Sequence, residues 1–163
     1  MKKNLLAILV FSVAVLMSSC GFEDGAIYVN DTLVDKAEKV EVLMSEVYDY
    51  IDEDEYDSAL AYLDSVTNHV KDSEIAIAKL KNKSAEEFKQ SVLEYLAMYS
   101  ATVADYRQAI EWYQSEDDEL FEKANDIINN FDVITDEKLS EIIALQKEFA
   151  ENNNLELDYD YNK

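Results

Sequence analysis

Side chains suited to catalysis or metal binding are scarce in this chain, which has one histidine and one cysteine. A di-iron centre in a helical bundle uses two Glu-x-x-His motifs, but Val66 stands three positions before His69 and there is no second histidine. A serine nucleophile would also depend on His69, and the glycine turn that exposes such a serine is missing. We therefore expect no catalytic residue, no metal site and no cofactor, with His69 on a helix surface near Asp72.

The 36 acidic residues supply many pairs of carboxylates, and chance accounts for such pairs in so acidic a chain. One group, Asp52, Asp54 and Asp57, could bind Ca²⁺ through carboxylate oxygens. It lacks the glycine and the terminal glutamate of a calcium-binding EF-hand loop. A solvated turn is therefore the favoured interpretation of these acids.

A stripe of tyrosines recurs at helical spacing in the second half of the chain: Tyr95, Tyr99, Tyr106 and Tyr113. Tyrosines can line a pocket and orient an aromatic or lipid-like ligand through their hydroxyl groups. They can also pack in a core, with each hydroxyl reaching solvent or a carboxylate, and this is the interpretation that we favour.

The only tryptophan and the only arginine of the chain, Trp112 and Arg107, lie beside this stripe. Both residue types are enriched among the side chains that contribute most to binding at protein interfaces. The sequence therefore predicts that a partner, if the body docks one, contacts Arg107, Trp112 and Tyr113.

Cys20 follows a segment with the pattern of a secretory signal peptide, in which Lys2 and Lys3 precede 13 uncharged residues, Leu5 to Met17. The run is too short to span a bilayer, which takes about 20 residues. The motif Leu16-Met17-Ser18-Ser19-Cys20 resembles a bacterial lipoprotein box, although Met17 replaces the commoner leucine. We predict a signal peptide over residues 1–19 and lipid attachment at Cys20. The alternatives are a cleavable signal that leaves a free cysteine and a retained signal-anchor helix.

In signals of this kind the cysteine receives a diacylglycerol thioether, and the amine exposed by cleavage is usually acylated too. Two or more acyl chains give stable anchoring, so residues 20–30 are expected to tether a body that stays in water to a membrane. In the alternative, Ile27, Tyr28 and Val29 pack back on the body. Gly21 after the cysteine favours the outer membrane of a Gram-negative-type envelope over the inner membrane, on either its periplasmic or its surface face. Glu23-Asp24 loosely resembles acidic signals for export to the cell surface.

Charge and backbone composition constrain the body of the protein. The full chain has a net charge of −22, and without the predicted signal peptide the value is −24. Such a chain is repelled by phosphate backbones and by anionic lipid, so nucleic acid is not expected as a partner. There is no proline, and the two glycines, Gly21 and Gly25, both lie near Cys20. Since tight turns and hairpins depend on these residues, the body is predicted to be nearly all helix.

Apolar residues at heptad spacing divide this body into four amphipathic helices. The expected helices cover residues 31–52, 55–82, 85–114 and 118–152. Asn30 or Asp31 is the expected cap of the first helix, and Asp54 is that of the second. Ser84 and Glu87 have the spacing of a capping box, which predicts the start of the third helix.

Two places interrupt these patterns. Asp72-Ser73 could divide the second helix, and the apolar seam of the fourth is broken across residues 129–135, where helix propensity is also poor. Thr135 could cap a new helix there, so one kinked helix and two stacked helices fit equally well. Residues 153–163 form an acidic tail that is expected to be loose, although it could pair as an edge strand.

Long amphipathic helices joined by short polar turns pack as an antiparallel up-down bundle. We therefore predict an all-α fold, with one bundle domain of four main helices over residues 31–152.

Several features spread over most of the mature chain are shared with a known family. They are Tyr28-Val29-Asn30-Asp31, the aromatic residues Phe88, Tyr95, Tyr99 and Tyr106, and Leu145 to Glu151 followed by Leu155. In these the chain resembles the uncharacterised bacterial surface lipoproteins that are named after a leptospiral surface protein. The resemblance implies a helical fold and an envelope or surface location, and it brings no known activity.

The expected function is therefore a membrane-anchored, non-enzymatic interaction or structural module that has a protein partner. A helical bundle that binds a small ligand or a cation is the alternative.

Overall fold

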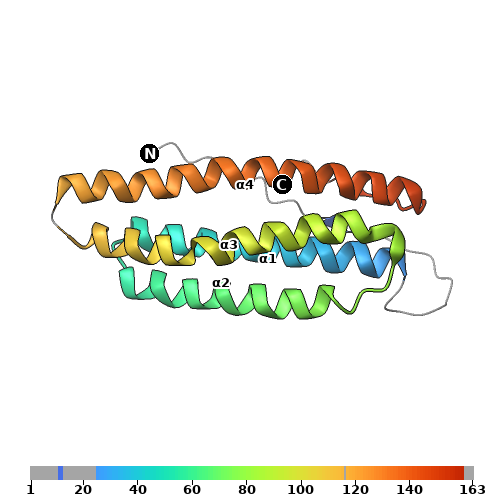
Figure 1. Cartoon of the computed structure of the whole chain (residues 1–163), viewed down its shortest axis with the longest axis horizontal. Coiled ribbons are helices and arrows are strands. Elements are labelled where there is room, and N and C mark those ends of the chain that lie inside the picture. The colour runs from blue at the N-terminus through green and yellow to red at the C-terminus, as the bar shows by residue number, and fades with distance from the viewer. Residues whose placement is uncertain (1–10, 13–24, 116, 160–163) are drawn as a thin grey trace.

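The computed structural model describes residues 11–12, 25–115 and 117–159 of the chain. The described part contains four long helices: α1 (Ala26–Asp52), α2 (Tyr56–Ile77), α3 (Glu86–Tyr113) and α4 (Asp118–Asn152). A short 3-10 helix, Lys83–Ala85, precedes α3. Figure 1 shows the four helices lying side by side and joined by short turns. The predicted all-α, up-down bundle is confirmed.

Contacts between neighbouring helices establish their directions. Lys36, in the first half of α1, contacts His69 in the second half of α2. Ser91, near the start of α3, contacts Glu141 in the second half of α4. Arg107, near the end of α3, pairs with Asp64 in the first half of α2. Consecutive helices therefore run antiparallel. α4 packs mainly along α3 and contacts α1 much less (Figure 1).

One face of each helix forms the core. The largest side chains that are fully buried include Leu33, Val40 and Val47 of α1, Leu63 of α2, and Phe88, Leu96 and Ile110 of α3. Burial of a side chain of this size stabilises the fold by about 1.5–3 kcal/mol. α4 adds Phe131 and Phe149, but its buried face also includes the polar residues Thr135 and Gln146. Of these two, Gln146 contacts α1, whereas the hydroxyl of Thr135 bonds within α4 itself.

The first helix begins earlier than the sequence pattern indicated. α1 starts at Ala26, with Gly25 as its N-cap residue, so the expected cap at Asn30 or Asp31 is wrong, and residues 26–30 are helix instead of tether. The alternative that this segment packs on the body holds for Val29. Val29 and Asn30 are fully buried. The apolar contacts of Val29 and a hydrogen bond made by Asn30 stabilise an additional turn of helix before the first heptad position.

The second helix is continuous through Asp72-Ser73 and ends at Ile77, five residues before the expected end. Ser73 is fully buried, so it occupies a core position instead of breaking the helix. Leu80 lies beyond the helix but is also buried. The heptad pattern therefore predicts correctly that Leu80 is buried. Its prediction of where the helix ends is wrong.

The predicted capping box before α3 does not form. Asn82 Oδ1 accepts hydrogen bonds from the backbone N–H of Ser84 at 2.9 Å and from Ser84 Oγ at 2.7 Å. The hydroxyl of Ser84 therefore donates to Asn82 instead of capping α3. Ala85, the residue directly before α3, has no side chain that could cap the helix. Asn82 caps the 3-10 turn instead, and α3 begins within one residue of the expected position.

The fourth helix is a single helix of 35 residues, so the two-helix alternative is wrong. Asp117 caps it, because its Oδ1 accepts hydrogen bonds from the backbone N–H of Glu119 and Leu120. Thr135 does not cap a new helix. Its Oγ1 donates to the carbonyl oxygen of Phe131 at 3.0 Å, which satisfies the hydroxyl inside a continuous helix.

Two short strands complete the described structure. β1 (Phe11–Ser12) pairs antiparallel with β2 (Asp158–Tyr159), so part of the acidic tail is paired as a strand. Among the described residues, no helix has a stretch long and apolar enough to cross a membrane.

Candidate functional site

A network of tyrosines and carboxylates lies where α1, α3 and α4 meet. Its members are Glu41 and Tyr48 of α1, Tyr95, Tyr99 and Tyr106 of α3, and Asp132 of α4. The tyrosine stripe of the sequence supplies half of this network. Tyr95 and Tyr106 are no more than 1 % exposed, and their hydroxyls are hydrogen-bonded. The predicted core packing is confirmed for both. The hydroxyl of Tyr95 reaches a carboxylate as expected, whereas that of Tyr106 reaches the hydroxyl of Tyr48.

The first half of the network ends on α1. Tyr95 OH donates to Glu41 Oε1 at 2.6 Å and lies 3.0 Å from Tyr99 OH. Because a hydroxyl has only one hydrogen to donate, Tyr95 must accept from Tyr99. The rings of Tyr95 and Tyr99 meet edge to face at 5.1 Å. Both tyrosine protons therefore point along one chain toward the carboxylate of Glu41.

The second half of the network ends on α4. Tyr48 OH donates to Asp132 Oδ1 at 2.9 Å, and it lies 2.6 Å from Tyr106 OH. By the same count of hydrogens, Tyr48 accepts from Tyr106. This chain connects α3, α1 and α4 in turn, so it fixes the position of α4 relative to the other two helices.

Burial determines the protonation of the network. It raises the pKa of Tyr48, Tyr95 and Tyr106 well above the usual range, so these phenols remain protonated donors. Burial also raises the pKa of Glu41 and Asp132, and in each case a tyrosine hydrogen bond opposes the rise. The nearby charge of Asp136 adds to both rises. The tyrosines of the network therefore stay protonated, and their hydrogen bonds hold α1, α3 and α4 in position.

Glu38 is a half-buried carboxylate one turn before Glu41 on α1. Its Oε1 is out of contact with solvent and accepts no hydrogen bond from the described residues. Burial, followed by the charges of Glu41 and Asp35, raises the pKa of Glu38 to about 7. Its charge is therefore destabilising in the folded protein at neutral pH.

A second polar contact joins α1 to α4 outside the tyrosine network, near the start of α1 and the end of α4. Gln146 Nε2 donates to Asn30 Oδ1 at 3.1 Å, and both residues are buried. A buried amide without a partner is unfavourable, so each of these two side chains requires the other. The pair explains why the first turn of α1 is ordered against α4.

Replacing Gln146 by leucine should lower the free energy of unfolding by about 1–3 kcal/mol, because Asn30 Oδ1 would remain buried without its donor. Replacing Asn30 and Gln146 together by leucine should recover most of this loss, since no polar atom of the pair is then left unpaired. Urea unfolding of both single variants and the double variant measures the coupling. Losses that simply add would contradict the pairing.

The three residues predicted to meet a partner are not on one face of α3. Arg107 forms an ion pair with Asp64 of α2. Tyr113 OH donates to Asn125 of α4 at 2.9 Å. Trp112 is half-buried, and the two other side chains point to helices on either side of α3. They share an end of the bundle, but they do not form a continuous surface.

His69 and the acidic turn have positions that the sequence did not fully predict. His69 is half-buried between α1 and α2, where Nε2 donates to the carbonyl oxygen of Lys36 at 3.0 Å, so a simple surface position is wrong. Asp54 lies in the turn with φ of 61° and accepts from Tyr56 OH. Within the described ranges, no group of three or more acidic, histidine or cysteine side chains is arranged to hold a metal ion. Cys20 lies outside the described residues.

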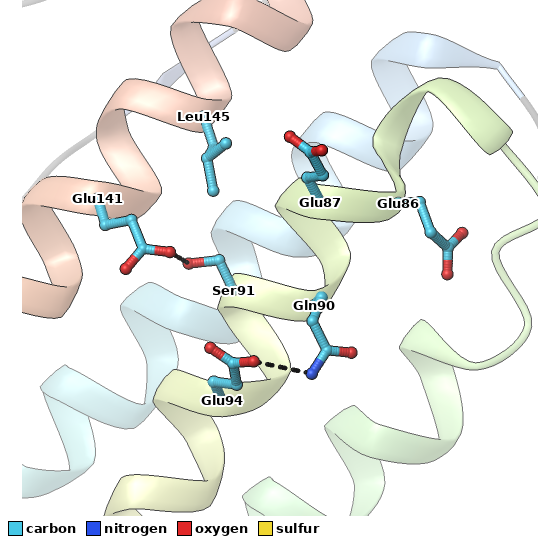
Figure 2. Close-up of a pocket in the computed structure, with 7 residues that line it drawn as sticks. All are labelled: Glu86, Glu87, Gln90, Ser91, Glu94, Glu141 and Leu145. Carbon is cyan, nitrogen blue, oxygen red and sulfur yellow. Dashed lines mark hydrogen bonds between the residues drawn. The ribbon is translucent and has the colours of Figure 1, made fainter.

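A shallow groove between α3 and α4 is the feature of the surface that sequence analysis missed. Figure 2 shows its lining, which is mostly acidic: Glu86, Glu87, Gln90, Ser91, Glu94, Glu141 and Leu145. Ser91 Oγ donates to Glu141 at 3.0 Å, and Gln90 donates to Glu94 at 2.9 Å. Lys138 forms ion pairs with both Glu94 and Glu141. Several of these polar groups pair with one another across the groove, so this part of the surface is a polar, net acidic contact between the two helices.

Comparison with known proteins gives no matching family model, no matching curated protein and no matching solved structure.

Proposed function

We propose that this protein is an envelope lipoprotein, held to the outer membrane by acyl chains on Cys20, whose bundle is a non-enzymatic interaction or structural module. The observation that carries the proposal is the short spacing between the anchor motif and the folded body. The bundle begins at Ala26, so five residues separate it from Cys20. Such a segment spans at most about 18 Å. The resemblance to bacterial surface lipoproteins supports the same location.

The interior of the bundle favours a role for its surface over an internal ligand site. The tyrosines that could have lined a pocket are packed, and Tyr95 and Tyr106 direct their protons toward Glu41 and Tyr48. These donors are already used within the protein. Among the described residues, this use of the donors favours a surface role over the alternative of a small-ligand or cation-binding bundle.

Replacing Cys20 by alanine should abolish metabolic labelling with a fatty acid and release the protein from the membrane fraction, because the thiol that carries the lipid is gone. Labelling and fractionation of cells that express the wild type and the variant measure both effects. Proteolysis of intact cells in the same experiment reports which face of the membrane carries the bundle. Persistent labelling of the variant, or an unlabelled wild type, would contradict lipid anchoring at Cys20.

A protein partner is proposed to contact the end of the bundle that is farthest from Ala26, where Trp112 lies. Crosslinking in membranes should capture a defined partner, and Trp112→Ala should reduce its capture several-fold because a large side chain is lost from the contact. Ile75→Ala is the matched control, since Ile75 is 57 % exposed on α2. Equal capture by wild type and Trp112→Ala would argue against this surface.

A further inference from the structure

The two ends of the bundle differ in the charge of their turns. The tether end consists of the start of α1 at Ala26, the turn 78–85 between α2 and α3, and the end of α4 (Figure 1). Asn153 Nδ2 reaches Ser84 Oγ at 3.4 Å, which places the end of α4 beside this turn. The opposite end, the acid end, consists of the turns between α1 and α2 and between α3 and α4.

The charges of these turns are opposite in sign. The turn 78–85 contains three lysines and no acidic residue: Lys79, Lys81 and Lys83. At the acid end, residues 52–57 include five acidic residues, residues 115–119 include four, and neither segment has a lysine or arginine. The bundle therefore has a basic turn at the tether end, with exposed acids close by: Glu86 and Glu87 directly follow the turn, and Glu148 and Glu151 lie near the end of α4. The positive charge is confined to the turn itself.

The three lysines are held in the exposed part of their turn. Leu80 is buried between Lys79 and Lys81, so it attaches the turn to the core while its two neighbours are exposed. The carbonyl oxygen of Leu80 also accepts a hydrogen bond from Lys89 Nζ at 3.0 Å. None of the three exposed lysines takes part in an ion pair with another described residue. Their charges are therefore accessible to a ligand outside the protein.

We propose that Lys79, Lys81 and Lys83 form a docking surface for the phosphate groups of anionic lipids and hold the bundle upright on the bilayer. This inference rests on the proposed anchoring at Cys20, which keeps the tether end close to the headgroups. Lysines near an anionic surface are attracted to it within about a Debye length. The sides and the acid end carry most of the −22 net charge, so the same surface repels them.

The upright orientation has a consequence for the acid end. α4 has 35 residues, which corresponds to a length of about 52 Å at 1.5 Å per residue. This length is several times the Debye length of about 8 Å at physiological ionic strength. The acid end, with Trp112 close to it, would thus project into solution beyond the field of the membrane.

Energy transfer on vesicles tests the orientation. The lipidated full chain, labelled with a donor dye at Ala78→Cys in the basic turn or at Glu53→Cys in the acid end, is reconstituted on vesicles whose headgroups carry an acceptor dye. The vesicles contain phosphatidylcholine alone or phosphatidylcholine with phosphatidylglycerol. We expect the ratio of transfer from the two sites to increase several-fold in favour of Ala78→Cys when phosphatidylglycerol is present. High salt, which shortens the Debye length to about 3 Å, should remove the increase.

Matched triple variants separate position from total charge. Replacing Lys79, Lys81 and Lys83 by glutamine should return the ratio to its phosphatidylcholine value. The same replacement at three other exposed lysines, Lys39, Lys71 and Lys123, changes the net charge equally and should leave the increase intact.

Each failure has its own meaning. If the chain floats with vesicles and the ratio does not respond to phosphatidylglycerol or to the turn variant, the docking surface is refuted while anchoring stands. If the full chain does not float with vesicles of either composition, both the anchoring and the orientation are refuted.

Discussion

Replacing Tyr106 by alanine should lower the free energy of unfolding by about 3–5 kcal/mol, the range typical of truncating a large aromatic side chain in a core. Its ring is fully buried and packs edge to face on Phe131, with ring centres 5.5 Å apart. The variant also removes the hydrogen-bond donor to Tyr48. Since domains are stable by only about 5–15 kcal/mol, this single change should lower the melting temperature by about 10 °C or more.

Two variants divide this effect into its parts. Tyr106→Phe keeps the ring and removes the hydroxyl, so it should cost about 1 kcal/mol. Phe121→Ala truncates a comparable ring that is 48 % exposed on α4 and should cost less than Tyr106→Ala. Urea unfolding of the three variants gives the comparison. An equal loss for Tyr106→Ala and Phe121→Ala would contradict the central position of Tyr106.

The architecture could be predicted because each helix repeats the same information many times. Leu33, Val40 and Val47 follow one another at steps of seven, so an error at one position leaves the pattern of α1 intact. The absence of proline and the scarcity of glycine act over the whole body. Both signals can be read from the local sequence, without knowledge of how the helices are finally arranged.

Helix ends were less predictable because single side chains compete for the same groups there. Ser84 and Asn82 can both cap the region before α3, and Asn82 binds the Ser84 hydroxyl and backbone N–H together. The start of α1 depends on Gln146, which is 116 positions away from Asn30 in the sequence. A window of local sequence contains no information about that partner.

The carboxylate members of the network could not be chosen from sequence. Glu41 and Asp132 are two of 36 acidic residues, and their role depends on which helices are adjacent and in what register. A partial signal did exist in α1, since Glu41 and Tyr48 are seven positions apart and so share a face beside the apolar seam. The tyrosine stripe indicated that acceptors were needed, but it did not identify them.

The stability of the bundle should fall as the pH rises from about 4.5 to about 7. Burial raises the pKa of Glu38, Glu41 and Asp132 above their usual values. In this interval, which is set by Glu38, the folded chain keeps a proton that the unfolded chain has released, and its free energy of unfolding decreases as that proton is lost. The raised pKa values of Glu41 and Asp132 act in the same direction. The growing negative charge of the chain acts in the same direction. Glu94 acts oppositely, because hydrogen bonding to Lys138 lowers its pKa, but that effect belongs to more acidic solutions.

Replacing Glu38 by glutamine should weaken this pH dependence and stabilise the protein at about pH 8 by about 1 kcal/mol. A rise from 4.5 to about 7 corresponds to about 3 kcal/mol for a fully enclosed group, but solvent screens the half-buried Glu38 and reduces the effect. Near pH 4.5 the two proteins should be almost equally stable, because Glu38 is then protonated in the folded state.

Glu137→Gln on α4 is the matched control, since it removes the same charge from an exposed position and should leave the pH dependence nearly unchanged. Thermal unfolding followed by circular dichroism between about pH 5 and about pH 8 measures all three curves. If Glu38→Gln gave a curve parallel to that of the wild type, the unpaired carboxylate oxygen of Glu38 would not be the source of the loss of stability with rising pH. The remaining pH dependence would then have to come from Glu41, Asp132 and the overall repulsion among acids.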